Sequence, residues 1–80
     1  MKIYSYKGSS NISGRRIKTS RRRLGLSQAE LAVKLQVEGV CLEQKSISRI
    51  ECGSRCVTDY ELLAFASVLK TTVQWLLTGE

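Results

Sequence analysis

The sequence has no histidine and a single aspartate, and its three cysteines form no CxxC pair. A structural zinc site needs four ligands at short paired spacings, and nucleophilic enzymes need a base beside the nucleophile. Neither set can be assembled from these residues, and there is no glycine-rich phosphate-binding loop. We therefore expect no metal, no cofactor, no small-molecule ligand and no enzymatic activity.

Cys41, Cys52 and Cys56 are an odd number of thiols in a chain whose start shows no secretory signal. This pattern is typical of reduced cysteines that pack as small hydrophobic side chains. We expect them to be half-buried. Redox sensing by any of the three stays open as an alternative.

Long apolar runs are also missing, because no stretch approaches the roughly 20 residues that a membrane span needs. The first residues, MKIYSYKGSSN, carry neither an apolar signal segment nor a lipidation motif. We expect a soluble, cytoplasmic protein that does not contact a membrane. With 80 residues it forms one small domain that must use almost every apolar side chain in its core.

Acidic residues are absent from the first 29 positions, which hold eight of the thirteen Lys and Arg residues. The rest of the chain has five basic and seven acidic side chains, so the formal charge of +6 is concentrated in one third of the sequence. Such asymmetry favours a polyanionic partner. Nucleic acid fits better than an anionic membrane, because no basic amphipathic helix with bulky aromatics is present. A merely solvated basic face is the alternative.

Apolar residues at helical spacing, and no strand pattern, predict an all-α protein. We expect a flexible basic arm over residues 1–13 and a five-helix domain over residues 14–80. The five expected helices cover about residues 14–24, 28–38 and 44–51, a stretch that begins after Thr58, and a stretch from about residue 73 to Gly79.

Capping motifs place the helix boundaries. Ser27 and Glu30 have the S-x-x-E spacing of a capping box, and Thr58 and Glu61 repeat it. Thr71 or Thr72 caps the last helix. Gly39 is the first good stop after the helix that begins near residue 28.

The stretch QKSISRIE, residues 44–51, has two unlike faces. Ile47, Ile50 and Glu51 lie on one side of the expected helix. The other side holds polar side chains, namely Gln44, Lys45, Ser48 and Arg49. Two short helices joined by a link and covered by two more indicate a helix-turn-helix domain. A solvated surface is the alternative explanation of the polar face.

Three motifs, LGLSQAELA at residues 24–32, SISRIECG at residues 46–53 and VQWLLTGE at residues 73–80, occur in one order. With them the sequence resembles, over about residues 14–79, the DNA-binding domain of the phage repressor and Cro family, also called Xre-type regulators. The resemblance implies a five-helix, repressor-like fold. It also implies a sequence-specific regulator, a repressor that occupies its promoter, binding double-stranded operator DNA as a homodimer with the helix at 44–51 in the major groove.

The resemblance also implies which side chains contact DNA. The positions that contact bases hold Gln44, Lys45, Ser46 and Arg49. The positions that contact phosphates hold Gln28, Ser54 and Arg55, with the first-helix cations Lys18 and Arg22 as further candidates. Gln can pair with adenine, and Lys or Arg can donate to guanine, so the residue types suit the role.

Arg21 and Glu51 are charges on the otherwise apolar stripes of their helices, which suggests that they pair. Family members that resemble this sequence carry an Arg–Glu ion pair at these two positions. The link between the second and third helices is several residues longer than the family's tight turn, and Gln36 stands where the usual turn glycine would be. We expect the second helix to run on to about Glu38, with Gly39 reversing the chain.

Trp75, Leu76 and Leu77 are the expected dimer contact, unless they serve only to close the monomer core. A different kind of function also stays open, namely a protein-interaction module of antitoxin or anti-regulator type in which DNA binding is secondary. An exposed apolar patch near residues 73–77 would favour it.

Overall fold

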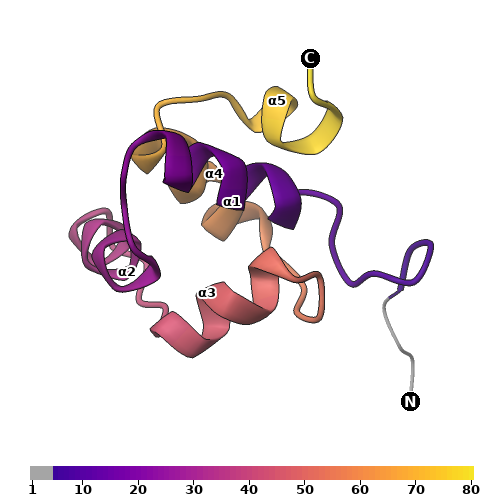
Figure 1. The fold of residues 1–80 in the computed structure, drawn as a ribbon, viewed down its shortest axis with the longest axis horizontal. Coiled ribbons are helices and arrows are strands. Elements are labelled where there is room, and N and C mark those ends of the chain that lie inside the picture. The colour runs from indigo at the N-terminus through magenta and orange to yellow at the C-terminus, as the bar shows by residue number, and fades with distance from the viewer. Residues whose placement is uncertain (1–4) are drawn as a thin grey trace.

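The computed structural model describes residues 5–80, so Lys2 of the expected arm lies outside the described residues. The helices are α1 (Gly14–Arg23), α2 (Gln28–Val37), α3 (Gln44–Glu51), α4 (Asp59–Val68) and α5 (Val73–Thr78). The predicted all-α class is confirmed. In Figure 1, α3 forms one edge of the molecule and α5 the opposite edge, with α1 and α4 between them. No helix within residues 5–80 is long and apolar enough to cross a membrane.

The core is built from the apolar stripes of all five helices. Seven of its large side chains are completely buried: Ile17, Leu31, Leu35, Ile47, Ile50, Phe65 and Leu76. Burial of a side chain of this size contributes about 1.5–3 kcal/mol relative to exposure. α3 supplies two of the seven, so its orientation is determined by how these isoleucines fit between the other helices.

Both predicted capping boxes are present. The Glu30 N–H donates to Ser27 Oγ at 3.0 Å, and Glu30 Oε1 accepts from the Ser27 N–H at 2.8 Å. Thr58 and Glu61 make the same reciprocal pair at the start of α4. α5 is capped by Thr72, whose hydroxyl accepts from the Trp75 N–H at 3.0 Å. These caps satisfy N–H groups that a helix cannot pair by itself.

The long link between α2 and α3 is resolved as the sequence predicts. α2 ends at Val37 with Glu38 as its C-cap, and Gly39 has a φ of 89°. Glycine adopts this left-handed conformation without steric cost, and the reversal lets the Val40 N–H donate to the Leu35 carbonyl at 3.0 Å. The side chain of Val40 then packs against the core.

The described part of the arm is tied to the far end of α3. A tight turn with two backbone hydrogen bonds joins Tyr6 to Ser9, and the Ser10 N–H donates to the Gly53 carbonyl at 2.7 Å. Asn11 Nδ2 donates to the carbonyls of Ile50 at 3.0 Å and of Arg55 at 2.8 Å. Residues 9–13 of the expected flexible arm are therefore anchored to the body of the domain.

Gly14 marks the point where α1 meets the end of α3. A Cβ atom at this position would collide with the Ile50 carbonyl oxygen and crowd Asn11 Oδ1, which accepts from the Gly14 N–H at 2.7 Å. Asn11 thus bonds to α1, to α3 and to the loop that follows α3. A single side chain connects three segments.

Replacing Asn11 by alanine removes the donor for two carbonyl groups. We expect Asn11→Ala to lower the free energy of unfolding by about 1–3 kcal/mol, because partly buried acceptors lose their partner. Thermal unfolding followed by circular dichroism measures the effect, with Gln74→Ala, a change at an exposed amide on α5, as the control. Equal melting temperatures for the Asn11 variant and the parent protein would contradict this role.

Candidate nucleic-acid interface

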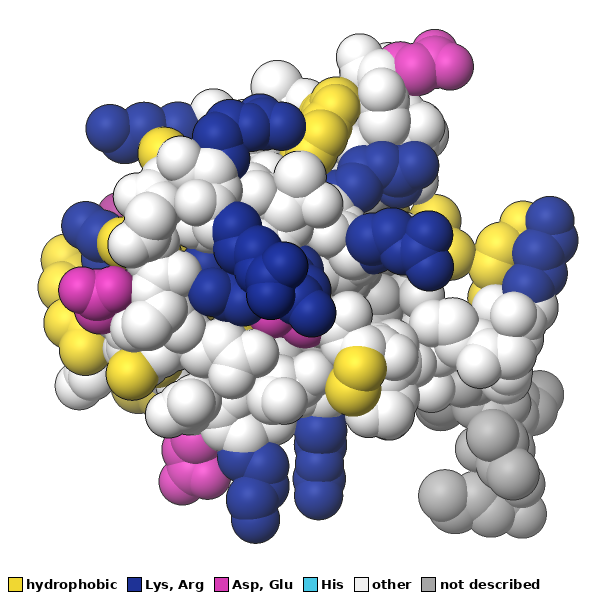
Figure 2. Space-filling model, viewed as in Figure 1, with side chains coloured by type: hydrophobic (Ala, Val, Ile, Leu, Met, Phe, Trp, Pro, Cys, Tyr) yellow, Lys and Arg dark blue, Asp and Glu magenta, His cyan; other side chains and the backbone are white. Residues whose placement is uncertain are grey.

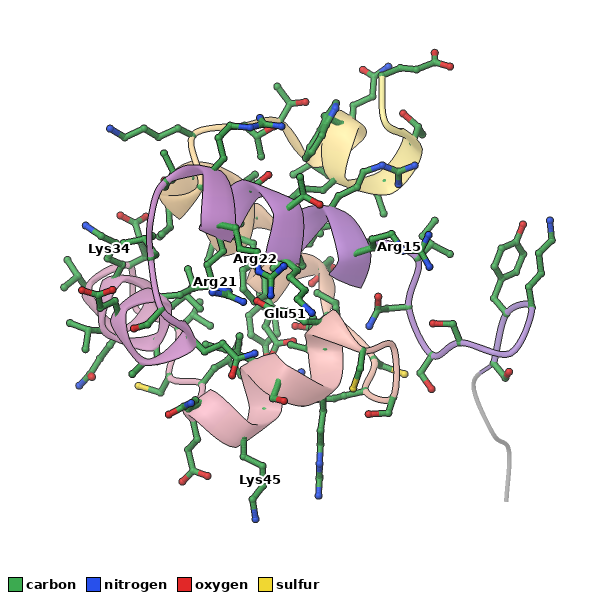
Figure 3. The ribbon with its side chains drawn as sticks, viewed as in Figure 1. Arg15, Arg21, Arg22, Lys34, Lys45 and Glu51 are labelled. Carbon is green, nitrogen blue, oxygen red and sulfur yellow. The ribbon has the colours of Figure 1, made fainter. Side chains whose placement is uncertain are left out.

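α3 separates its side chains into a buried and an exposed face. Ile47 and Ile50 are completely buried and Glu51 is 9% exposed, whereas Gln44, Lys45 and their polar neighbours face solvent. Figure 3 shows Lys45 projecting away from the other helices, and Glu51 directed back toward α1. The polar face predicted from the sequence is therefore a free surface of the domain.

An open groove runs between this face and the start of α2. It is lined by side chains from the two helices, namely Gln28, Gln44, Lys45, Ser48 and Arg49. Four of these are sequence-predicted site residues. Ser48 was not among the predicted contacts, although the sequence placed it on the polar face of the helix. Ser46, a predicted base contact, is half-buried.

An ion pair joins α1 and α3 on the side of α3 opposite its exposed polar face. Arg21 Nε donates to Glu51 Oε2 at 2.7 Å, and Arg21 Nη2 donates to Glu51 Oε1 at 3.0 Å. Arg21 Nη1 also donates to the Leu26 carbonyl at 2.8 Å, just before α2 begins. The hydrogen bonds to Glu51 raise the pKa of the Arg21 guanidinium above its ordinary value, and burial opposes them only in part.

Gln28 joins the same carboxylate from the first position of α2. Its Nε2 donates to Glu51 Oε1 at 3.1 Å. The ion pair and the predicted phosphate contact of α2 therefore form one network, which the sequence did not indicate, because residues 28 and 51 are far apart along the chain.

The loop after α3 stays close to the polar face. The Ser54 N–H donates to the Arg49 carbonyl at 2.9 Å, and Ser54 Oγ donates to the same oxygen at 3.3 Å. Ser54 is exposed beside the end of α3. This is where a loop contact to a phosphate was expected.

Arg55, in contrast, is already engaged. Its Nη1 and Nη2 donate to Glu61 Oε1 at 3.0 Å and Oε2 at 3.1 Å, so the guanidinium and the carboxylate form a two-bond pair. Burial raises the pKa of the Glu61 carboxyl, but hydrogen bonds from Arg55 and from the Thr58 N–H outweigh it and hold that pKa below its usual value. The structure places Arg55 as a link to α4 as well as at the predicted loop position.

Lys and Arg side chains gather over α1 and along the free edge of α3, as the dark blue atoms of Figure 2 show. Figure 3 places Arg22 on the face of α1 turned toward the viewer, and Arg15 near the start of that helix. Arg22 is exposed, and Lys18 is half-buried. The cationic surface predicted from the charge asymmetry therefore reaches the neighbourhood of the groove.

A family model described as a helix-turn-helix domain matches residues 14–79. The chain belongs to this family. Among curated proteins, the comparison finds no match. Helix-turn-helix domains bind DNA, so membership of this family indicates that the chain binds DNA and acts in transcription regulation.

Part of the segment expected to make the dimer contact is packed into this helix-turn-helix domain. Leu76 is completely buried and takes the alternative role of closing the core, so it has no surface for a dimer contact. Trp75 packs against the core with the Arg23 guanidinium 5.7 Å from its ring centroid, and Leu77 is 36% exposed. The expected apolar dimer patch is therefore reduced to the edge around Leu77.

The cysteines also differ from expectation, because Cys41, Cys52 and Cys56 are exposed instead of half-buried. Each lies in a segment between helices or at a helix end, where little packs over it. Cys52 Sγ is 3.6 Å from both the Arg49 carbonyl and Ser54 Oγ. The expectation that they are half-buried is wrong for all three.

The Arg21–Glu51 pair supplies a stability test. Arg21→Met leaves the Glu51 carboxylate buried without a counter-charge, and we expect a loss of about 3–5 kcal/mol in the free energy of unfolding. The double variant Arg21→Met/Glu51→Leu removes both charges and should be much closer to the parent protein. Denaturant unfolding measures the cycle. Losses that simply add in the double variant would contradict a pairing between the two charges.

The Arg55–Glu61 pair supplies a pH test. A carboxyl whose pKa is lowered in the folded state stabilises the protein above its ordinary pKa of about 4.5, and that stabilisation is lost as the pH falls through the folded value. In Arg55→Met a large part of what lowers the pKa of Glu61 is lost, so we expect a lower melting temperature near neutral pH and a smaller fall on acidification than in the parent protein. Arg15→Met, which changes an exposed arginine, is the control. Curves that fall in parallel for Arg55→Met and the parent would contradict the assignment.

Proposed function

We propose that this protein is a sequence-specific regulator of transcription of the phage repressor and Cro type, which binds double-stranded operator DNA with α3 in the major groove. The observation that carries the proposal is the groove between α3 and the start of α2, where polar side chains stand free while the isoleucines on the opposite face are buried. Repression would follow from occupying a promoter.

Base readout is assigned to the exposed side chains of α3. Gln44 can pair with adenine N6 and N7, and Lys45 and Arg49 can donate to guanine O6 and N7, each good contact contributing about 1–3 kcal/mol of discrimination. Ser46, half-buried beside them, can offer its hydroxyl at the margin of the groove. Ser48 joins this set because it lines the same groove.

Backbone contacts are assigned to the rim of the groove. Gln28 at the start of α2 and Ser54 after α3 can donate to phosphate oxygens, and Lys18 and Arg22 contribute charge from α1. Arg55 is the further candidate from the loop after α3. Its guanidinium would have to share its donors between a phosphate and Glu61.

A homodimer on DNA is part of the proposal, because one α3 of eight residues reads too few base pairs for a unique operator. In that arrangement two copies of α3 enter successive major grooves about 34 Å apart. Leu77, at the edge that remains exposed, is the proposed contact between the copies.

A second candidate is an interaction module whose main partner is a protein. The most exposed large apolar side chains lie away from the groove: Val37 at 82%, Leu63 at 65%, Val33 at 62% and Tyr60 at 62%. The exposure of these four side chains favours this alternative. It does not come from residues 73–77, the segment expected from the sequence.

A selection from a random duplex library at physiological salt, followed by sequencing of the retained DNA, tests the proposed function. We expect a two-fold symmetric motif with half-sites one helical turn apart. Lys45→Ala and Arg49→Ala should each relax the preference at one or two positions of each half-site. Retention without any motif, vanishing as salt rises, would overturn sequence-specific recognition and favour the protein-interaction module.

Lys34→Ala is the matched control for Lys45→Ala. It removes the same side chain and the same charge from an exposed site, and Figure 3 shows Lys34 and Lys45 projecting from different sides of the molecule. The motif that Lys34→Ala selects should equal that of the parent protein. Equal motifs for Lys45→Ala, Arg49→Ala and the parent protein would remove α3 from base recognition.

A further inference from the structure

The hydrogen bond between Gln28 and Glu51 determines how the Gln28 amide is oriented. A carboxylate only accepts hydrogen bonds when ionised, so the end of the amide that faces Glu51 Oε1 at 3.1 Å must be the Nε2 donor. The carbonyl end is then turned away. The two oxygens of Glu51 also accept hydrogen bonds from the Arg21 guanidinium.

The contact uses only half of the donor capacity of Gln28. An amide nitrogen carries two hydrogens, and one of them points to Glu51. Among residues 5–80 the side chain makes no other hydrogen bond, and Gln28 lines the open groove together with the polar side chains of α3. The second N–H is therefore free to serve a ligand in the groove.

Glu51 itself is rigidly placed. Its side chain is 3% exposed, Arg21 holds both of its oxygens, and it ends the helix whose isoleucines are completely buried. A buried carboxylate with three donors from two other helices has little freedom to rotate. Its charge is balanced by Arg21, so it does not repel a nearby phosphate as a lone carboxylate would.

We propose that Glu51 is a positioning residue for DNA binding, which holds the Gln28 amide so that its second N–H points at a phosphate of the duplex. The inference rests on the proposed function and extends it. The ion pair between α1 and α3 is thereby coupled to the contact that α2 makes with the DNA backbone. The Gln28 amide is oriented before DNA binds.

The test replaces single phosphates of the selected duplex by neutral methylphosphonates and measures the affinity of each duplex. One such phosphate should cost the parent protein about tenfold in affinity, since a hydrogen bond to a charged group is lost. Gln28→Met keeps the size of the side chain without its donors. It should bind the unmodified duplex more weakly than the parent protein, and the methylphosphonate at that position should not weaken its binding further. Glu51→Asp, too short to reach both Arg21 and Gln28, should lose the same sensitivity. Gln36→Met, the same change at an exposed position of α2, is the control and should behave as the parent protein.

Two results would overturn the inference while leaving DNA recognition intact. In the first, the methylphosphonate weakens binding by Gln28→Met as much as binding by the parent protein. Gln28 then donates to no phosphate. In the second, Glu51→Asp folds and is still weakened fully by the methylphosphonate to which Gln28→Met is insensitive. Glu51 then does not position Gln28. If the parent protein binds no duplex, the proposed function itself is wrong. That outcome is seen before any variant is compared.

A measurement on the unaltered protein covers the case in which Glu51→Asp does not fold. In a proton–nitrogen NMR spectrum the two side-chain amide protons of Gln28, assigned by their loss in Gln28→Met, should be well separated, because one is bonded to a carboxylate. On adding the duplex the second proton should shift and the first should stay in place. Movement of the first proton to an unbonded position would mean that Gln28 leaves Glu51 to bind DNA, and would overturn the inference.

Discussion

The rest of the structure depends on the buried carboxylate of Glu51. A charge taken out of water must be paired and hydrogen-bonded, and Glu51 meets this requirement with Arg21 of α1 and Gln28 of α2. The hydrogen bonds constrain direction as well as distance, which apolar packing alone does not. The ends of three helices are thereby held in one arrangement, and the polar face of α3 is left outward. Stability and the geometry of the groove have the same origin.

The C-terminal end of α3 raises the complementary problem of unpaired carbonyl groups. A helix of eight residues has few internal hydrogen bonds, and its last carbonyls need donors from elsewhere. Asn11 supplies one to the Ile50 carbonyl, and Asn11 and the Ser10 N–H also donate to the carbonyls of Arg55 and Gly53 in the loop after the helix. These donors come from a segment outside the matched helix-turn-helix family range of residues 14–79. The arm thus completes the helix that the proposed function uses most.

Two carboxylates near α3 are neutralised by buried ion pairs. Two of the acidic side chains near α3 or the loop after it, Glu51 and Glu61, are buried and paired with arginines. Each pair is nearly neutral as seen from outside, so neither Glu51 nor Glu61 offsets the exposed cations of α1 and α3. The same pairing explains why Arg55 contributes less free charge than its place in the sequence suggests. Counting arginines along the chain overstates the cationic surface wherever a buried carboxylate lies within reach.

Local patterns in the sequence were enough to predict the five helices, the caps at Ser27 and Thr58 and the two faces of α3, because each depends on residues within one or two helical turns. The sequence also pointed to Arg21 and Glu51 as a pair, since both interrupt apolar stripes. It could not predict that Asn11 bonds to carbonyls 39 and 44 residues away, or that the cysteines are exposed. Those outcomes, like the meeting of Gln28 with Glu51, arise when packing of the core brings distant segments together. Periodicity determines which side of a helix is buried, whereas only the tertiary structure decides which polar groups then lie within hydrogen-bonding distance.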